Sequence, residues 1–148
     1  MTSTAGGGFA RDTARESDDG RPKVVTICGS SRFVDIMAVC SWLIERDEQA
    51  ITMSLHLLPT WYGEVKDHIA EAEGVAEQMD DLHLRKIDLS DEIFVVNWTD
   101  YIGNSTQREV NYAMDRGIPV RWFTLDLIGD KVKDLILNRY SAATPEAE

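Results

Sequence analysis

Short apolar runs alternate with amphipathic stretches along this chain, and that alternation most constrains how it can fold. The spacing predicts strands at 23–28, 50–58, 92–98 and 118–123, and helices at 32–47, 105–116 and 127–140. Residues 64–90 predict either one long helix or two helices joined at Gly74. Strands separated by helices indicate a parallel sheet of four to five strands with helices on both faces. The expected fold class is therefore α/β, a doubly wound, Rossmann-like domain.

The 148 residues suit a single domain, which we place at 23–140. Residues 1–22 hold one large apolar side chain, Phe9, and are expected to form a disordered tail. Residues 141–148 are expected to be a frayed C-terminus. No repeat or basic-then-apolar leader interrupts this organisation.

The charge balance limits the partners. Lys and Arg total 15 against 26 Asp and Glu, a net charge of −11. Nucleic acids and anionic membranes need a basic face, so neither is expected as a partner. A small anionic ligand stays possible in such a chain, because a few backbone amides and one Arg can hold a phosphate.

The cysteine content indicates a reducing compartment. Cys28 and Cys40 are too few for a disulfide framework or a zinc site, and His56 and His68 are too scattered to act as metal ligands. We therefore expect a cytoplasmic protein without a bound metal.

The first candidate motif, Cys28-Gly29-Ser30-Ser31-Arg32-Phe33, joins the first expected strand to a helix. Its glycine permits a tight turn, its serines offer hydroxyl groups, and Arg32 offers a planar fork for a phosphate. The amides of a helix N-terminus also favour an anion. A plain helix cap with a solvent-facing Arg32 is the alternative.

The second candidate motif, at 97–109, joins the most strand-like segment to a helix. Asn97 is polar at the end of an apolar run, and Gly103 permits a turn. Thr106 and Glu109 match a capping box, in which Glu109 would bond back to the backbone. Glu109 pointing into a cleft as a nucleophile or base is the alternative.

Two further features carry weaker hypotheses. His83 is a candidate proton carrier, although a single His on a helix often only packs. Trp61 and Tyr62 are adjacent aromatic residues that would stack on a flat ring, cover the core or form a subunit contact. The acidic run at 71–81 is interpreted as a solvated helix face rather than a metal site.

Taken together, the segments 26–33, 82–97 and 101–123 resemble the nucleoside 2-deoxyribosyltransferase superfamily, which includes nucleoside 5′-monophosphate N-glycosidases. The resemblance implies a flavodoxin-like fold, a homodimer, and cleavage or transfer at the N-glycosidic bond of a nucleoside or 5′-monophosphate. It implies no metal and no organic cofactor. Hydrolysis is slightly favoured over transfer, because the turn at 29–32 is similar to the phosphate-binding turn of the monophosphate hydrolases.

Carried over residue by residue, the resemblance places Glu109 on the nucleophilic glutamate of the family, which forms a covalent glycosyl-enzyme. We expect the helix N-terminus to keep this carboxyl ionised. Asn97 stands where a second carboxylate is expected, so Asp100 or His83 is the substitute. The other expected site residues are Gly29, Ser30, Ser31, Arg32, Phe33, Gly103, Ser105 and Thr106 for phosphate or substrate, and Trp61 and Tyr62 for base stacking. A catalytically inactive nucleotide-binding or signalling module on the same fold is the alternative.

Overall fold

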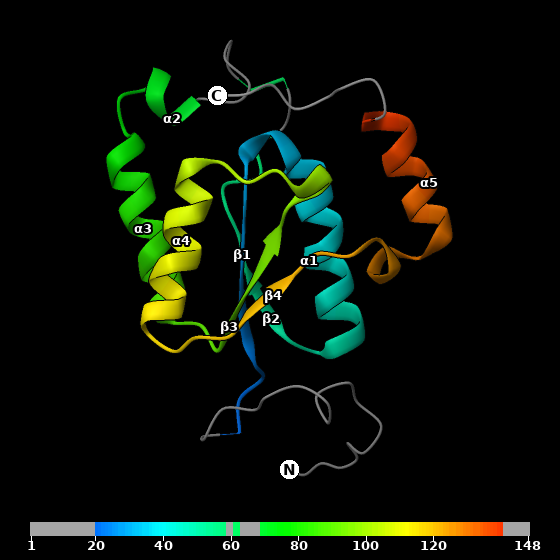
Figure 1. The fold of residues 1–148 in the computed structure, drawn as a ribbon, viewed down its shortest axis with the longest axis horizontal. Coiled ribbons are helices and arrows are strands. Elements are labelled where there is room, and N and C mark those ends of the chain that lie inside the picture. The colour runs from blue at the N-terminus through cyan, green and yellow to red at the C-terminus, as the bar shows by residue number, and fades with distance from the viewer. Residues whose placement is uncertain (1–19, 59–60, 63–68, 141–148) are drawn as a thin grey trace.

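The computed structural model describes residues 20–58, 61–62 and 69–140, and Figure 1 shows their arrangement. Four strands form one sheet: β1 (Val24–Gly29), β2 (Ile51–Met53), β3 (Glu92–Val96) and β4 (Val120–Trp122). All neighbouring strands run parallel, in the order β2-β1-β3-β4. The expected α/β, doubly wound, flavodoxin-like fold is confirmed. The expected tail at 1–22 lies almost wholly outside the described residues, and the expected C-terminal segment at 141–148 lies entirely outside them.

Helices cover both faces of the sheet (Figure 1). On one face lie α1 (Val34–Glu48) and α5 (Gly129–Tyr140), and on the other lie α3 (Ala76–Asp88) and α4 (Asn104–Asp115). The one-turn helix α2 (Ile69–Ala72) lies near the carboxyl ends of the strands. Short 3₁₀ helices occur at Ser31–Phe33 (η2), Trp98–Asp100 (η3) and Leu125–Ile128 (η4). Among the described residues, no helix has the length and apolar character needed to cross a membrane.

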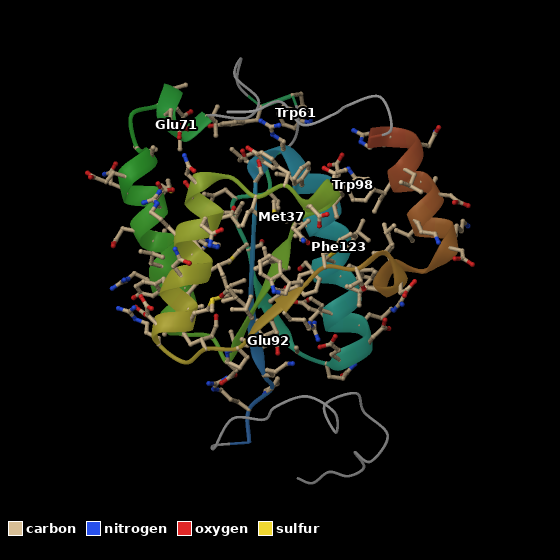
Figure 2. All side chains as sticks on the ribbon, in the orientation of Figure 1. Met37, Trp61, Glu71, Glu92, Trp98 and Phe123 are labelled. Atoms are coloured by element: carbon tan, nitrogen blue, oxygen red, sulfur yellow. The ribbon has the colours of Figure 1, made fainter. Side chains whose placement is uncertain are left out.

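Side chains of the two central strands alternate between two cores, as the period of a strand requires. Val25 and Ile27 of β1 pack toward α1 together with Met37, Trp98 and Phe123, the last three of which are labelled in Figure 2. Cys28, one residue further along β1, points to the opposite face. There it packs in a second core with Ile87 of α3, Ile93 and Val95 of β3, and Val110 and Ala113 of α4. The strand alternation therefore places the Cys28 thiol beneath α3 and α4.

The structure corrects one expected boundary and decides one alternative that the sequence left open. The expected strand at 50–58 is ordered as a strand only over Ile51–Met53, at the edge of the sheet. Just beyond it, the Ser54 carbonyl accepts a hydrogen bond from Lys86 Nζ at 2.7 Å instead of continuing the strand ladder. The expected helix at 64–90 is present as α2 and α3, separated at Gly74, whose φ of 77° is incompatible with a helix. Residues 63–68 lie outside the described part of the chain.

Candidate active site

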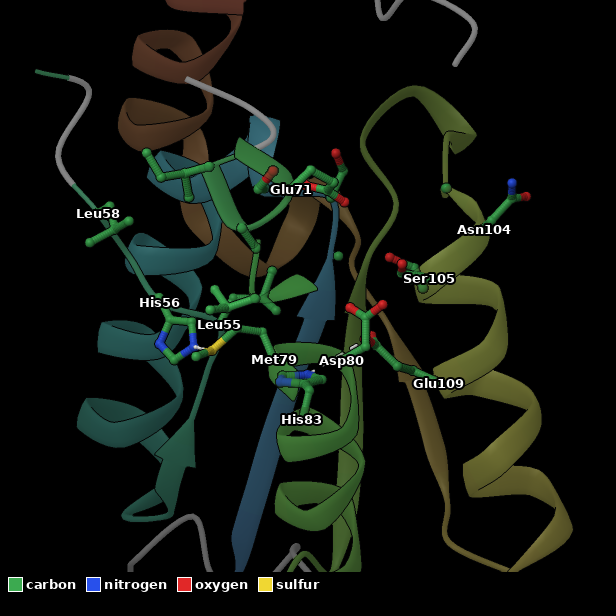
Figure 3. A pocket seen from close by; sticks show the side chains of 18 of the residues that line it. Leu55, His56, Leu58, Glu71, Met79, Asp80, His83, Asn104, Ser105 and Glu109 are labelled. Atoms are coloured by element: carbon green, nitrogen blue, oxygen red, sulfur yellow. Dashed lines mark hydrogen bonds and ion pairs between the residues drawn. The ribbon is translucent and has the colours of Figure 1, made fainter. Parts of the chain in front are cut away.

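A cavity of about 450 Å³ opens at the carboxyl ends of the strands, within the range of small-molecule sites. The chain passes from β1 to β2 on one side and later returns to β3 on the other, so the strand order reverses between β1 and β3. Parallel α/β sheets bind ligands at this switch point. The cavity lies between the segments that follow β1, β2 and β3 and the ends of α3 and α4 (Figure 3).

The structure brings most of the expected site residues to this cavity and leaves others outside its lining. The expected residues that line it are Gly29, Ser30, Ser31, Tyr62, His83, Gly103, Ser105, Thr106 and Glu109. Those that do not line it are Arg32, Phe33, Trp61, Asn97 and Asp100. Phe33 is buried in the core, whereas Trp61 and Asp100 are exposed. The Arg32 guanidinium lies over the ring of Tyr101, 4.9 Å from the ring centroid.

The start of α4 decides between the two interpretations of Glu109. The N-cap is Gly103, no side chain of the described residues caps this end, and Thr106 lies buried inside the first turn. The capping-box interpretation is therefore wrong. Glu109 lies in the second turn, one turn further from the helix N-terminus than we expected, and its side chain lines the cavity.

Three side chains from three elements meet beside the cavity, namely Cys28 of β1, His83 of α3 and Glu109 of α4, and the last two line it. His83 Nε2 lies 3.6 Å from Cys28 Sγ and 3.9 Å from Glu109 Oε1. His83 is 3% exposed and Glu109 is 5% exposed. Within the described residues, neither Glu109 Oε1 nor His83 Nδ1 has a hydrogen-bond partner. Figure 3 shows the Glu109 carboxyl reaching from α4 toward His83 and Asp80 on α3.

Burial changes the protonation of this cluster. It raises the pKa of Glu109 to about 8, and the nearby Asp80 charge adds to the rise, while contact with Cys28 and the charge of Arg108 oppose it. Burial also lowers the pKa of His83 to about 4, and the positive charge of Lys86 adds to the fall. At neutral pH the carboxyl is therefore mostly protonated and the imidazole is neutral.

This state corrects our expectation that the helix N-terminus keeps Glu109 ionised. The favourable field of a helix end acts mainly within its first turn. Glu109 lies beyond that turn, so desolvation outweighs the field. The same burial raises the pKa of the Cys28 thiol well above its ordinary value, with the Glu109 charge adding to the rise.

Several charged side chains line the cavity or contact its lining. Arg108 of α4 donates from Nη2 to Asp80 Oδ2 on α3 and to Ser105 Oγ, each at 3.2 Å, and so ties the two helices together. Glu71 and Glu73 also line the cavity, as does Lys86. Sequence reasoning missed Arg108 and Lys86. The helical spacing of His83 and Lys86, three residues apart, is the signal that places both on one face.

Close packing against β3, rather than the expected tight turn, requires a glycine at position 29. It is the last residue of β1 and pairs with Val96 of β3. A Cβ atom at this position would lie 3.1 Å from the Val96 carbonyl oxygen and 3.2 Å from Met37 Sδ. The next residue, Ser30, accepts a hydrogen bond from the Arg32 amide at 3.3 Å and caps η2. Both residues therefore fix the shape of the turn that borders the cavity.

No protein-family model and no curated protein matches the chain, so these comparisons assign it neither a family nor a function.

Proposed function

We propose that this protein breaks the N-glycosidic bond of a nucleoside or nucleoside 5′-monophosphate, with Glu109 as the nucleophile. One observation carries the proposal. A buried carboxyl, one oxygen of which has no hydrogen-bond partner among the described residues, lines a cavity of about 450 Å³ at the switch point of a parallel sheet. The resemblance of the segments at 26–33, 82–97 and 101–123 supplies the substrate class.

The reaction runs in two displacements. The Glu109 carboxylate attacks the anomeric carbon, the bond from that carbon to the base nitrogen breaks, and its electron pair leaves with the base. The transition state resembles an oxocarbenium ion, which an adjacent carboxylate stabilises. Water or a second base then attacks the same carbon and releases Glu109, so that configuration is retained over the two steps.

Glu109 has to lose its proton before it attacks. The proton passes to water in the open cavity, because His83, with its pKa lowered to about 4, is too weak a base to take it. The positive charge that develops on the sugar favours the ionised carboxyl, because opposite charges at short range lower the pKa of an acid. His83 stays neutral in this scheme and positions Glu109, whereas we first considered it as a proton donor to the leaving group.

Other lining residues fit the remaining parts of such a substrate. Asp80 is the second carboxyl near Glu109 and can accept a hydrogen bond from the base, while the leaving base takes its proton from water in the cavity. Tyr62 offers a ring for stacking. Ser30 and Ser31 offer hydroxyl groups for the sugar or a 5′-phosphate.

Chromatography of reaction mixtures tests this function. The protein is incubated with nucleosides and 5′-monophosphates in ribo and deoxy forms, with and without a second free base. Released base indicates a hydrolase, and a swapped nucleoside seen only with added base indicates a transferase.

Glu109→Gln should lower the rate at least about 1,000-fold. The exposed Glu77 of α3 does not line the cavity, so Glu77→Gln is the matched control and should keep full activity. Equal activity of Glu109→Gln and the wild type would contradict the proposal.

A nucleotide-binding module without catalysis is the second candidate. The raised pKa of Glu109 favours it, because a protonated carboxyl is a poor nucleophile but a good hydrogen-bond donor. Calorimetric titration separates the two functions. A binding module would take up nucleosides without releasing base, and Glu109→Gln would then weaken binding only modestly.

A further inference from the structure

We propose that Cys28, His83 and Glu109 together form a binding site for Zn²⁺ beside the cavity. Cys28 Sγ, a ring nitrogen of His83 and a carboxyl oxygen of Glu109 all lie within 4.8 Å of one another. Each comes from a different element, and the packing of β1 against α3 and α4 holds all three in place. The inference goes beyond the proposed function and does not depend on it.

The separations suit a tetrahedral zinc centre. Ordinary zinc bond lengths put a sulfur and a nitrogen ligand about 3.5 Å apart, and a nitrogen and an oxygen ligand about 3.4 Å apart. The observed distance from Cys28 Sγ to His83 Nε2 is 3.6 Å. The distance from His83 Nε2 to Glu109 Oε1 is 3.9 Å, and all three ligand atoms lie within 4.8 Å of one another, so the Glu109 carboxyl has to move closer when the ion binds.

An unbonded buried atom provides a second, independent indication. Glu109 Oε1 faces His83 and has no hydrogen-bond partner within the described residues, although only 5% of this residue is exposed. A buried polar atom without a partner is costly, and native proteins rarely leave one without a reason. A cation between Cys28, His83 and Glu109 would give that oxygen a partner.

The ligand types select the metal. Thiolate and imidazole ligands suit Zn²⁺ and its spectroscopic substitute Co²⁺, whereas Mg²⁺ and Ca²⁺ require oxygen ligands. The Cys28 thiol and the Glu109 carboxyl each give up their proton to solvent when they bind the ion. His83 and Glu109 also line the cavity, so the fourth coordination position faces the open space, where water or a ligand would occupy it.

The site has a consequence for the proposed reaction. A zinc ion on Glu109 would occupy the oxygen that attacks the sugar. Zn²⁺ should therefore inhibit the glycosidase and a chelator should restore it. We expected no metal from the sequence, because two cysteines are too few for a zinc site and His56 and His68 are too scattered to act as ligands.

Cobalt spectroscopy of the full chain, free of any added tag, tests the site. Co²⁺ is titrated into chelator-treated protein, and the near-ultraviolet thiolate-to-cobalt absorption is recorded. We expect a one-to-one complex with this band, which Zn²⁺ removes by displacement and Mg²⁺ does not. Cys28→Ser should abolish the band. Cys40→Ser is the matched control, because Cys40 is equally buried but lies in the core on the α1 face, and it should keep the band.

Two further variants keep the test decisive if Cys28→Ser fails to fold. His83→Gln and Glu109→Gln should each weaken Zn²⁺ binding by more than about 100-fold in calorimetric titration, because losing even an outer-shell partner costs 10–100-fold. No thiolate band in the wild type, or a band of equal strength in Cys28→Ser, would overturn the site. Cobalt binding without base release would reject the proposed function alone, and base release without cobalt binding would reject the metal site alone.

Discussion

At the scale of single residues, burial moves the pKa values of Glu109 and His83 in opposite directions. Desolvation disfavours the charged form of each group, so the pKa of the carboxyl rises to about 8 and that of the imidazole falls to about 4. At an exposed position the same two residues would form an ordinary ion pair near pH 6. Here they meet as neutral groups, and the residue types alone do not reveal that state.

The free energy of unfolding should therefore depend on pH through Glu109. Between pH 4.5 and 8 the unfolded chain has lost the Glu109 proton and the folded chain keeps it, so raising the pH destabilises the fold. His83 acts in the opposite direction, but only between about pH 4 and 6.5. From pH 6.5 to 8 stability should fall by at most about 1.4 kcal/mol per pH unit.

Urea denaturation of metal-free protein across that window measures the effect. Glu109→Gln removes the titrating carboxyl, so its stability should stay nearly constant from pH 6.5 to 8. Parallel stability curves for the wild type and the variant would show that Glu109 is not buried as a neutral acid.

At the scale of elements, the sequence predicted best those parts that are buried on a continuous face. β1, β3, α1 and α4 begin and end within about two residues of their expected positions, because their apolar patterns leave one interpretation each. The strand predicted at 50–58 is longer than the observed β2. An apolar run continues through Leu58, but the strand lies at the sheet edge and its backbone leaves the ladder at Ser54. No local pattern reports where an edge strand stops pairing.

Gly29→Ala should be destabilising by about 1–3 kcal/mol, because the added Cβ has no room. Met37 Sδ can move away, but the Val96 carbonyl oxygen belongs to the neighbouring strand and cannot move without distorting the sheet. Urea denaturation measures the loss. If Gly29→Ala were as stable as the wild type, β1 and β3 would not pack as closely as described.

At the scale of the whole molecule, topology assembles a site that no single segment encodes. The candidate residues after β1 and β3 were predictable, because the carboxyl ends of parallel strands converge at one edge. Cys28 was not predicted as a site residue, because its local sequence does not show that its thiol lies beside His83 and Glu109. Arg32 was expected to hold a phosphate, yet it lies over Tyr101 and outside the cavity lining.

The homodimer implied by the resemblance stays a prediction, which light scattering will test.

The most direct test of the central claim is to trap the glycosyl group on Glu109. A nucleoside with fluorine at the 2′ carbon slows hydrolysis of the intermediate, because the electron-withdrawing atom destabilises an oxocarbenium-like transition state. Intact-protein mass spectrometry after incubation should show the chain heavier by one fluorinated sugar. Peptide mapping should place that sugar on Glu109, and Glu109→Gln should acquire none. Release of base without any adduct, or an adduct on another residue, would contradict the assignment of Glu109 as the nucleophile.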